Sequence, residues 1–232
     1  PTFRAQYPSE AAAYLKKAKA GWAFLIRAIA TFGKDGSYQR IGHYGNEFQH
    51  DDELAWAAAA MFAATGNPDF LNRLRRWYDP SDPNTHRWGW WRLFEGYGCA
   101  ARTYAFAART RRLRAKALDK VWLAKARAEI IAAGNDIERF ARDNAYGTSF
   151  PEMNKVHQSA GWYFSSERAF ELAVADQLEP NPAYLPAMIG NMNYEGGCNP
   201  VNVPYITGLG WQRWREIVHQ YAQNDYQTLP PS

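Results

Sequence analysis

Apolar residues recur along this chain at intervals of three and four positions, which is the repeat of an α-helix with one buried face. The first stripe consists of Ala11, Leu15, Ala18, Trp22, Leu25 and Ile29. Ser9 is placed to cap this helix, and Gly33 is placed to end it. Strand patterns are limited to an extended segment at 201–206, because Pro200 and Pro204 lack the amide hydrogen that a strand ladder needs. The sequence therefore predicts an all-α protein.

The same repeat predicts seven further helices, at about 51–65, from 68 onward, from 88–91 to 107, at 117–134, 165–178, 182–193 and 211–224. Gly66 ends the second helix, and Gly134 with Asn135 is expected to break the fifth. The fifth helix has one apolar face, formed by Ala117, Val121, Ala124, Ala128 and Ile131. The last helix is expected to bury Trp211, Trp214, Val218 and Tyr221.

Long connections rich in Gly, Pro, Asn and aromatic residues separate some of these helices, at 35–50, 78–87, 146–157 and 194–210. Loops of this length in a helical domain are usually functional. Neither an exact repeat nor a Pro/Ser-rich linker interrupts the chain, so we predict one domain over residues 1–232 with no internal boundary.

Composition excludes several classes of protein. Hydrophobic residues make up 47% of the 232 residues, which excludes a disordered chain. The 27 basic and 23 acidic residues nearly balance, and the basic run at 109–116 has no interleaved aromatic residues, so no nucleic-acid partner is predicted. No apolar run reaches the roughly 18 residues of a membrane span. His86, His157 and Cys198 lack metal-ligand spacing, so we predict no metal and no cofactor, while the redox state of Cys99 and Cys198 stays open.

Aromatic residues are abundant, at 16% of the chain, with ten Trp and fourteen Tyr. Flat rings with a polar edge suit a surface that holds a partly apolar, hydroxylated ligand such as a sugar. A large helical core is the alternative use of these rings.

Two motifs resemble those of glycoside hydrolase family 9. Residues 50–56 read His-Asp-Asp-Glu-Leu-Ala-Trp and continue to Ala-Thr-Gly-Asn-Pro-Asp-Phe at 64–70. This segment is similar to the family's Asp-Glu-Leu-x-Trp and Ala-Thr-Gly-Asp pattern. Residues 199–210 read Asn-Pro-Val-Asn-Val-Pro-Tyr-Ile-Thr-Gly-Leu-Gly and are similar to the family's Asn-Pro-x-x-x-Ser-Tyr-Val-x-Gly-Phe-Gly loop. The motifs stand in the family's order and at about its separation.

The resemblance implies an (α/α)6-barrel type helical toroid, incomplete in this chain, from a secreted or periplasmic enzyme. It implies inverting cleavage of β-linked, β-1,4-glucan-type polysaccharides or oligosaccharides. Inversion needs one carboxyl group as acid and another as base. The family's Asp-Ala-Gly-Asp motif is missing, and no Glu follows Glu216. We therefore expect the catalytic carboxylates in segments outside this chain, the remainder of the catalytic domain as its partner, and no activity from this chain alone.

Substrate-binding residues follow from the positions that match the family. Asp52 matches the carboxylate that contacts sugar hydroxyls, although Asp51, Asp52 and Glu53 are also typical of a helix N-terminus. Trp90 matches a sugar-stacking Trp, and Tyr205 lies in the matching loop. His219 matches part of a His-His-Arg motif whose Arg is replaced by Gln220.

Near the first motif, the family's platform Trp is replaced by Glu47, with Tyr44 close by in sequence. This departure indicates a substrate other than plain cellulose, and an acidic residue there favours a sugar bearing an amine.

Two other functions fit the same features. A non-catalytic carbohydrate-binding or scaffold protein on this fold would tolerate the missing Arg and platform Trp. A polysaccharide lyase on the same toroid would draw a catalytic His and Tyr from His43, Tyr44, His157 or His219.

Overall fold

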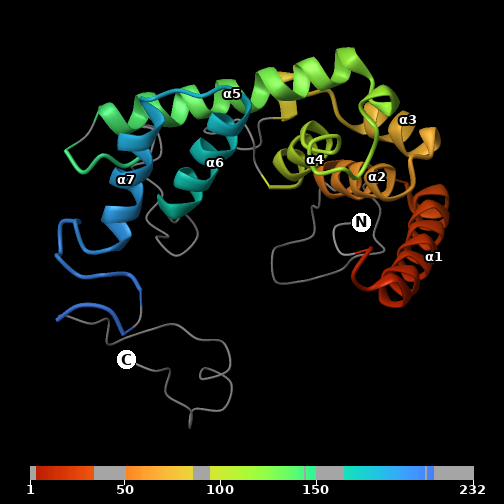
Figure 1. Cartoon of the computed structure of the whole chain (residues 1–232), viewed down its shortest axis with the longest axis horizontal. Coiled ribbons are helices and arrows are strands. Elements are labelled where there is room, and N and C mark those ends of the chain that lie inside the picture. The colour runs from red at the N-terminus through yellow and green to blue at the C-terminus, as the bar shows by residue number, and fades with distance from the viewer. Residues whose placement is uncertain are drawn as a thin grey trace, which may run out of the picture. The chain divides into compact units, whose positions relative to one another are not determined.

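The computed structural model describes residues 4–33, 51–85, 95–143, 145–149, 165–206 and 208–211. Seven α-helices lie in these ranges, and none of the described residues forms a strand (Figure 1). They are α1 (Pro8–Phe32), α2 (Asp51–Thr65), α3 (Pro68–Trp77), α4 (Glu95–Ala105), α5 (Lys120–Arg142), α6 (Ser165–Leu178) and α7 (Tyr184–Glu195). Two short 3-10 helices, η1 (Pro83–Thr85) and η3 (Ala115–Ala117), lie in the connections. The predicted all-α class is confirmed.

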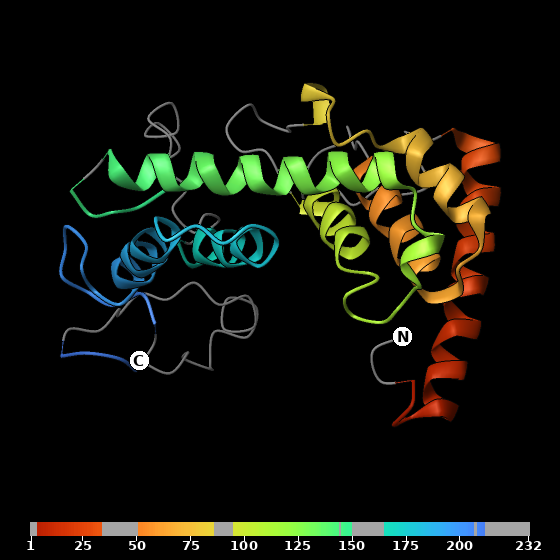
Figure 2. The ribbon, with the colours of Figure 1, turned by 45° about the horizontal axis from the view of Figure 1, so that its top comes forward.

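The chain divides into two compact units, Pro1–Ile130 and Ile131–Ser232. The first unit contains α1 to α4 and the first half of α5. The second contains the rest of α5 with α6 and α7. Helix α5 runs through the division without interruption (Figure 2). One domain with no internal boundary stays a prediction.

Helix ends follow local chemistry. Gly33 and Gly66 have φ of 79° and 69°, which favour glycine, and their amides donate to the carbonyls of Ile29 and Phe62. The Asn67 side chain accepts a hydrogen bond of 3.0 Å from the Asp69 amide and caps α3. The predicted cap at Ser9 is wrong. Helix α1 begins at Pro8, whose fixed φ and missing amide suit the first turn, and Ser9 donates to the Glu10 carboxylate instead.

The core of the first unit packs α2 against α3 and α4. Small residues make this approach close, since Ala55, Ala58 and Ala59 are fully buried. A Cβ added to Gly96 would lie 2.5 Å from the Asp52 carbonyl, so α4 contacts the α2 backbone directly. The Phe62 ring stacks on the Tyr104 ring with centroids 5.7 Å apart, which joins α2 to α4.

The apolar face predicted for the fifth helix is wrong. Val121 is 69% exposed, and Ala124 and Ala128 are exposed as well. Helix α5 buries a neighbouring face formed by Trp122, Ala126, Ile130, Ala133, Ile137 and Ala141. This face carries the larger apolar side chains, and their burial removes more apolar area from water.

The predicted break at Gly134 is also wrong, because α5 continues to Arg142. Gly134 is buried, and a Cβ built on it would lie 2.5 Å from the Cβ of Ala175 in α6. The Tyr184 hydroxyl of α7 donates a 2.7 Å hydrogen bond to the Asn135 side chain beside it. Glycine at 134 therefore permits helix contact inside the second unit and does not end the helix.

The predictions for α6 and α7 hold to within two residues, whereas those for the burial of Trp211 and of the α1 stripe do not hold in full. Helix α6 matches its predicted bounds, and α7 begins and ends two residues later than predicted. Trp211, expected to be buried, is fully exposed, and 212–224 lies outside the described residues, as does the Trp-rich segment 88–91. In α1 the residue classed as buried is Ala28, so the predicted apolar stripe is only partly covered.

Replacing Gly134 by Ala should lower the free energy of unfolding by about 1–3 kcal/mol, because the new methyl group overpacks the contact with Ala175. Gly21 in the middle of α1 is the matched control, since nothing lies within 4 Å of a Cβ there. Gly21→Ala should be neutral or stabilising by up to about 1 kcal/mol. Urea unfolding followed by circular dichroism measures both, and equal effects of the two variants would contradict the packing role of Gly134.

Candidate functional site

Asp52 lies in the first turn of α2 and is 1% exposed. Its Oδ2 accepts a hydrogen bond of 3.3 Å from the amide of Gly96, in the first turn of α4. A carboxylate at a helix N-terminus is favoured by the free amides and the dipole of that helix. Asp52 therefore connects the motif helix to the start of α4, whose sequence follows the Trp-rich stretch directly.

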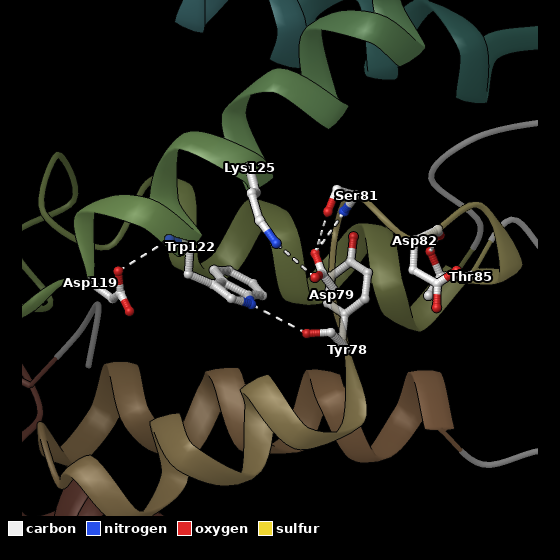
Figure 3. A network of polar contacts seen from close by, with 8 residues as sticks. All are labelled: Tyr78, Asp79, Ser81, Asp82, Thr85, Asp119, Trp122 and Lys125. Atoms are coloured by element: carbon white, nitrogen blue, oxygen red, sulfur yellow. Dashed lines mark hydrogen bonds and ion pairs between the residues drawn. The ribbon is translucent and has the colours of Figure 1, made fainter.

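The connection after α3 is fixed by a polar and aromatic network around Trp122 (Figure 3). The indole Nε1 of Trp122 donates 3.2 Å to the Tyr78 carbonyl, and its ring packs edge-on against the rings of Tyr78 and Tyr104. The Tyr104 hydroxyl accepts a 2.7 Å hydrogen bond from the Asp119 amide. Burial raises the pKa of Tyr104 to about 12 and raises that of Tyr78 further, so both phenols stay neutral.

Beside these rings, an ion pair joins the same connection to α5. Lys125 Nζ lies 2.7 Å from Asp79 Oδ2, and Ser81 donates to Asp79 Oδ1 from its amide and its hydroxyl (Figure 3). The hydrogen bond from Lys125, followed by that from Ser81, lowers the pKa of Asp79 to about 2. Asp119 caps the start of α5 through the amides of Val121 and Trp122 and also pairs with Arg75 of α3.

In the second unit, Asn199 shapes the loop that matches the family motif. Its side-chain nitrogen donates to the carbonyls of Tyr194 and Val203, and its Oδ1 accepts from the amides of Val201 and Val203. Asn199 is 2% exposed, so these contacts replace its contacts with water. Asn199 therefore fixes the shape of this loop.

Tyr205 leaves this loop next to the end of α7. Its amide donates 2.8 Å to the Glu195 carbonyl, and its half-buried ring lies edge-on to that of Tyr194, 5.8 Å away. Burial, followed by Tyr194, raises the pKa of Tyr205 to about 12. Tyr194 also packs edge-on against Tyr146, whose side chain is 44% exposed. The three rings form a tyrosine cluster in which Tyr146 is exposed and Tyr194 and Tyr205 are half-buried.

The segment that carries Tyr146 is held against α7 by a buried amide. Asn191 is fully buried, and its Oδ1 accepts from the Ser149 amide while its nitrogen donates to the Ser149 hydroxyl. A Cβ on Gly190 would lie 2.5 Å from the Gly147 carbonyl, so the two backbones touch. This contact fixes the position of Tyr146 relative to Tyr194.

The described ranges include two of the six predicted site residues. Asp52 belongs to the first unit and Tyr205 to the second. Trp90, Tyr44, Glu47 and His219 lie outside the described residues. The substrate contacts of all six residues stay predictions.

Sequence reasoning missed Tyr194 and Tyr146 as neighbours of Tyr205, and it missed the network around Trp122. The signal for Tyr194 was its position five residues before the Asn-Pro turn. No spacing rule could have joined Tyr78 to Trp122, because 44 residues separate them.

Within the described ranges, no three His, Cys, Asp or Glu side chains gather into a metal site. Cys99 and Cys198 are both free thiols. Among the described residues, no helix combines the length and the apolarity needed to cross a membrane.

Comparison with known proteins identifies the class. The family model described as Glycosyl hydrolase family 9 matches residues 2–230. The chain therefore belongs to glycosyl hydrolase family 9.

A cellodextrinase of Butyrivibrio fibrisolvens is 22% identical over 187 residues, covering 77% of this chain and 32% of that protein. The crystal structure of the family 9 endoglucanase J30 matches with a TM-score of 0.57 at 20% identity, covering 79% of this chain and 33% of that structure. A Zn-binding triple mutant of that endoglucanase matches with a TM-score of 0.55 at 20% identity, covering 75% and 31%. The likeness confirms the (α/α)6-barrel fold class. The chain spans about a third of the length of these proteins.

Asp79→Asn should remove a stabilising charge at neutral pH. The folded-state pKa of Asp79 is lowered to about 2, so its contribution is present above about pH 4 and is lost as pH falls from 4 to 2. The pair with Lys125 is partly exposed, so we expect a loss of at most about 1 kcal/mol at pH 7. Thermal unfolding at pH 7 and at pH 2.5 measures this difference.

The control for this prediction is Lys125→Gln. In that background Asp79→Asn should cost clearly less at pH 7, because the charge partner is gone. If Asp79→Asn changes the melting temperature by the same amount at pH 7 and at pH 2.5, the role of the ion pair is contradicted.

Proposed function

We propose that this chain is part of a glycosidase domain that hydrolyses β-linked, β-1,4-glucan-type polysaccharides or oligosaccharides with inversion. The observation that supports the proposal is the match of the family 9 model to residues 2–230. The cellodextrinase and endoglucanase names of the similar proteins favour a glucan substrate. We further propose that the enzyme is secreted or periplasmic.

The catalytic acid and base are proposed to come from the remainder of the catalytic domain, outside this chain. An inverting pair needs two carboxyl groups roughly 6.5–9.5 Å apart, one to protonate the leaving oxygen and one to activate water. The family's motif for the base and its downstream Glu are not found in this sequence. The chain spans about a third of the length of its relatives.

The proposed contribution of this chain is substrate binding. Asp52 and Trp90 are proposed to belong to one sugar site. The match of both positions to the family supports this. Gly96 is hydrogen-bonded to Asp52, and Trp90 lies within about 22 Å of Gly96, the greatest span of the six residues between them. Stacking on an indole face buries the apolar face of a sugar ring, and a carboxylate accepts its hydroxyl groups.

Further sugar contacts are proposed at Tyr44, Glu47, Tyr205 and His219. The tyrosine cluster supports Tyr205, since phenol groups offer both a flat face and a hydrogen-bonding edge to a carbohydrate.

Residues 1–232 alone should release no sugar from β-1,4-glucan oligosaccharides, because this sequence contains neither the family's motif for the base nor its downstream Glu. The measurement is reducing-sugar release, compared with that of the protein expressed from the complete reading frame. The sugar that this complete protein first releases should have the inverted anomeric configuration by NMR. Hydrolysis by residues 1–232 would contradict the proposal that the catalytic carboxylates lie outside this chain. Binding without any hydrolysis by the complete protein would favour a carbohydrate-binding scaffold, and an unsaturated product would favour a lyase.

Trp90→Ala in the complete enzyme should weaken oligosaccharide binding by about 1–2 kcal/mol, the scale of burying one aromatic face. Trp56→Ala is the matched control, since Trp56 is 47% exposed on α2 and has no proposed sugar contact. Isothermal titration calorimetry measures affinity, and thermal unfolding checks the fold. Unchanged affinity with a large loss of stability would place Trp90 in the core.

A further inference from the structure

Tyr146 combines an exposed side chain with a firmly held backbone, and all its described neighbours lie in the second unit. Its ring packs edge-on against that of Tyr194, with centroids 5.9 Å apart and an angle of 76° between the planes. Tyr194 lies edge-on to Tyr205 in turn, at 5.8 Å. An edge-on contact does not cover both faces of a ring, and Tyr146 is 44% exposed. Part of the residue is therefore accessible to a ligand.

A buried amide holds the segment 145–149 in place. Asn191 of α7 is fully buried, its Oδ1 accepts a 3.0 Å hydrogen bond from the Ser149 amide, and its Nδ2 donates 2.7 Å to the Ser149 hydroxyl. Gly147 has a φ of 65°, and a Cβ added to Gly190 would lie 2.5 Å from the Gly147 carbonyl oxygen. The segment thus lies directly on α7. Such support suits a binding residue, because a side chain that is already positioned loses less entropy when a ligand binds.

Tyr146 lies at the ends of helices and not on the side of one. It follows the last residue of α5 by four positions, and its partner Tyr194 stands in the last turn of α7. The motif loop returns to the same place, since the Tyr205 amide donates 2.8 Å to the Glu195 carbonyl. In a toroid of paired helices, neighbouring helices pack along helix sides, whereas connections run over the rims and often carry binding residues. The remainder of the catalytic domain is therefore expected to leave Tyr146 accessible.

We propose that Tyr146 is a sugar-contacting residue that offers its exposed ring to one pyranose unit of a β-linked glucan, and that Asn191 positions it. The inference rests on the proposed glycosidase function and extends its substrate site to a residue outside both family motifs. A phenol suits this role because its flat face packs on the C–H groups of a sugar ring, while its hydroxyl group donates and accepts hydrogen bonds.

Steady-state hydrolysis of cellotetraose by the complete enzyme tests the contact. Tyr146→Ala should raise KM about fivefold and change kcat by less than about twofold, because loss of uniform binding acts on KM. Tyr146→Phe should raise KM less, since it keeps the ring face. The matched control is Tyr14→Ala, which removes a tyrosine that is 72% exposed on α1 and should leave KM unchanged.

The role of Asn191 is tested through its partner. Ser149→Ala removes one hydrogen bond of the pair and keeps the bond from the Ser149 amide, so the enzyme should still fold. It should raise KM about twofold in the unmodified enzyme and leave KM unchanged in the Tyr146→Ala background, where the positioned side chain is gone. Asn191→Ala should show the same dependence with a larger first effect. Equal effects of Ser149→Ala in both backgrounds would overturn the positioning role.

Nitration by tetranitromethane, followed by peptide mass spectrometry, shows whether Tyr146 is accessible in the complete enzyme. We expect nitration at Tyr146, and an unmodified Tyr146 would overturn the proposal, because the remainder of the domain then covers it. An unchanged KM for Tyr146→Ala, in an enzyme that hydrolyses cellotetraose, would overturn this inference and leave the proposed function standing. A complete protein that does not hydrolyse cellotetraose would overturn both.

Discussion

Trp122 is the side chain on which the first unit depends most. Its indole nitrogen donates to the Tyr78 carbonyl in the connection after α3, while its ring contacts the rings of Tyr78 and of Tyr104 in α4. Trp122 thus combines apolar burial with one hydrogen bond, and the ring packing and the hydrogen bond together fix the orientation of the indole. Asp119 and Lys125, on either side of it along the chain, add a helix cap and an ion pair that fix the start of α5. Losing the indole would remove the hydrogen bond to Tyr78 and both ring contacts together.

The abundant aromatic residues of this chain lie in two different environments. In the first unit, Phe62, Tyr78, Tyr104 and Trp122 are core residues, and burial keeps the two phenols neutral. In the second unit, the rings of Tyr146, Tyr194 and Tyr205 meet nearer the surface. The two groups of rings therefore differ in exposure, and the first group confirms the use of aromatic residues in the core. The proposed sugar-binding role fits the more exposed rings, since a fully buried ring has no face left for a ligand.

The N-terminal half of α1 carries an apolar face that the other described residues leave open. A helical toroid buries each helix against neighbours, and α1 lacks such cover over its N-terminal half among the described residues. Such a face favours association, because exposed apolar stripes are costly in water. The glycines at 96, 134 and 190 show the opposite condition, in which a neighbouring segment approaches so closely that no side chain fits.

The sequence by itself determined the elements with purely local causes. The 3.6-residue repeat, Gly33, Gly66 and Pro68 predicted α1, α2 and α3, and the two motifs predicted the family. Only the tertiary structure decided which face of α5 is buried, because apolar residues occur on more than one side of that helix. It also decided that Gly134 permits a helix contact, and that Asp52 reaches the amide of Gly96. These outcomes depend on partners 40 or more residues away, and periodicity along the chain carries no information about such distant neighbours.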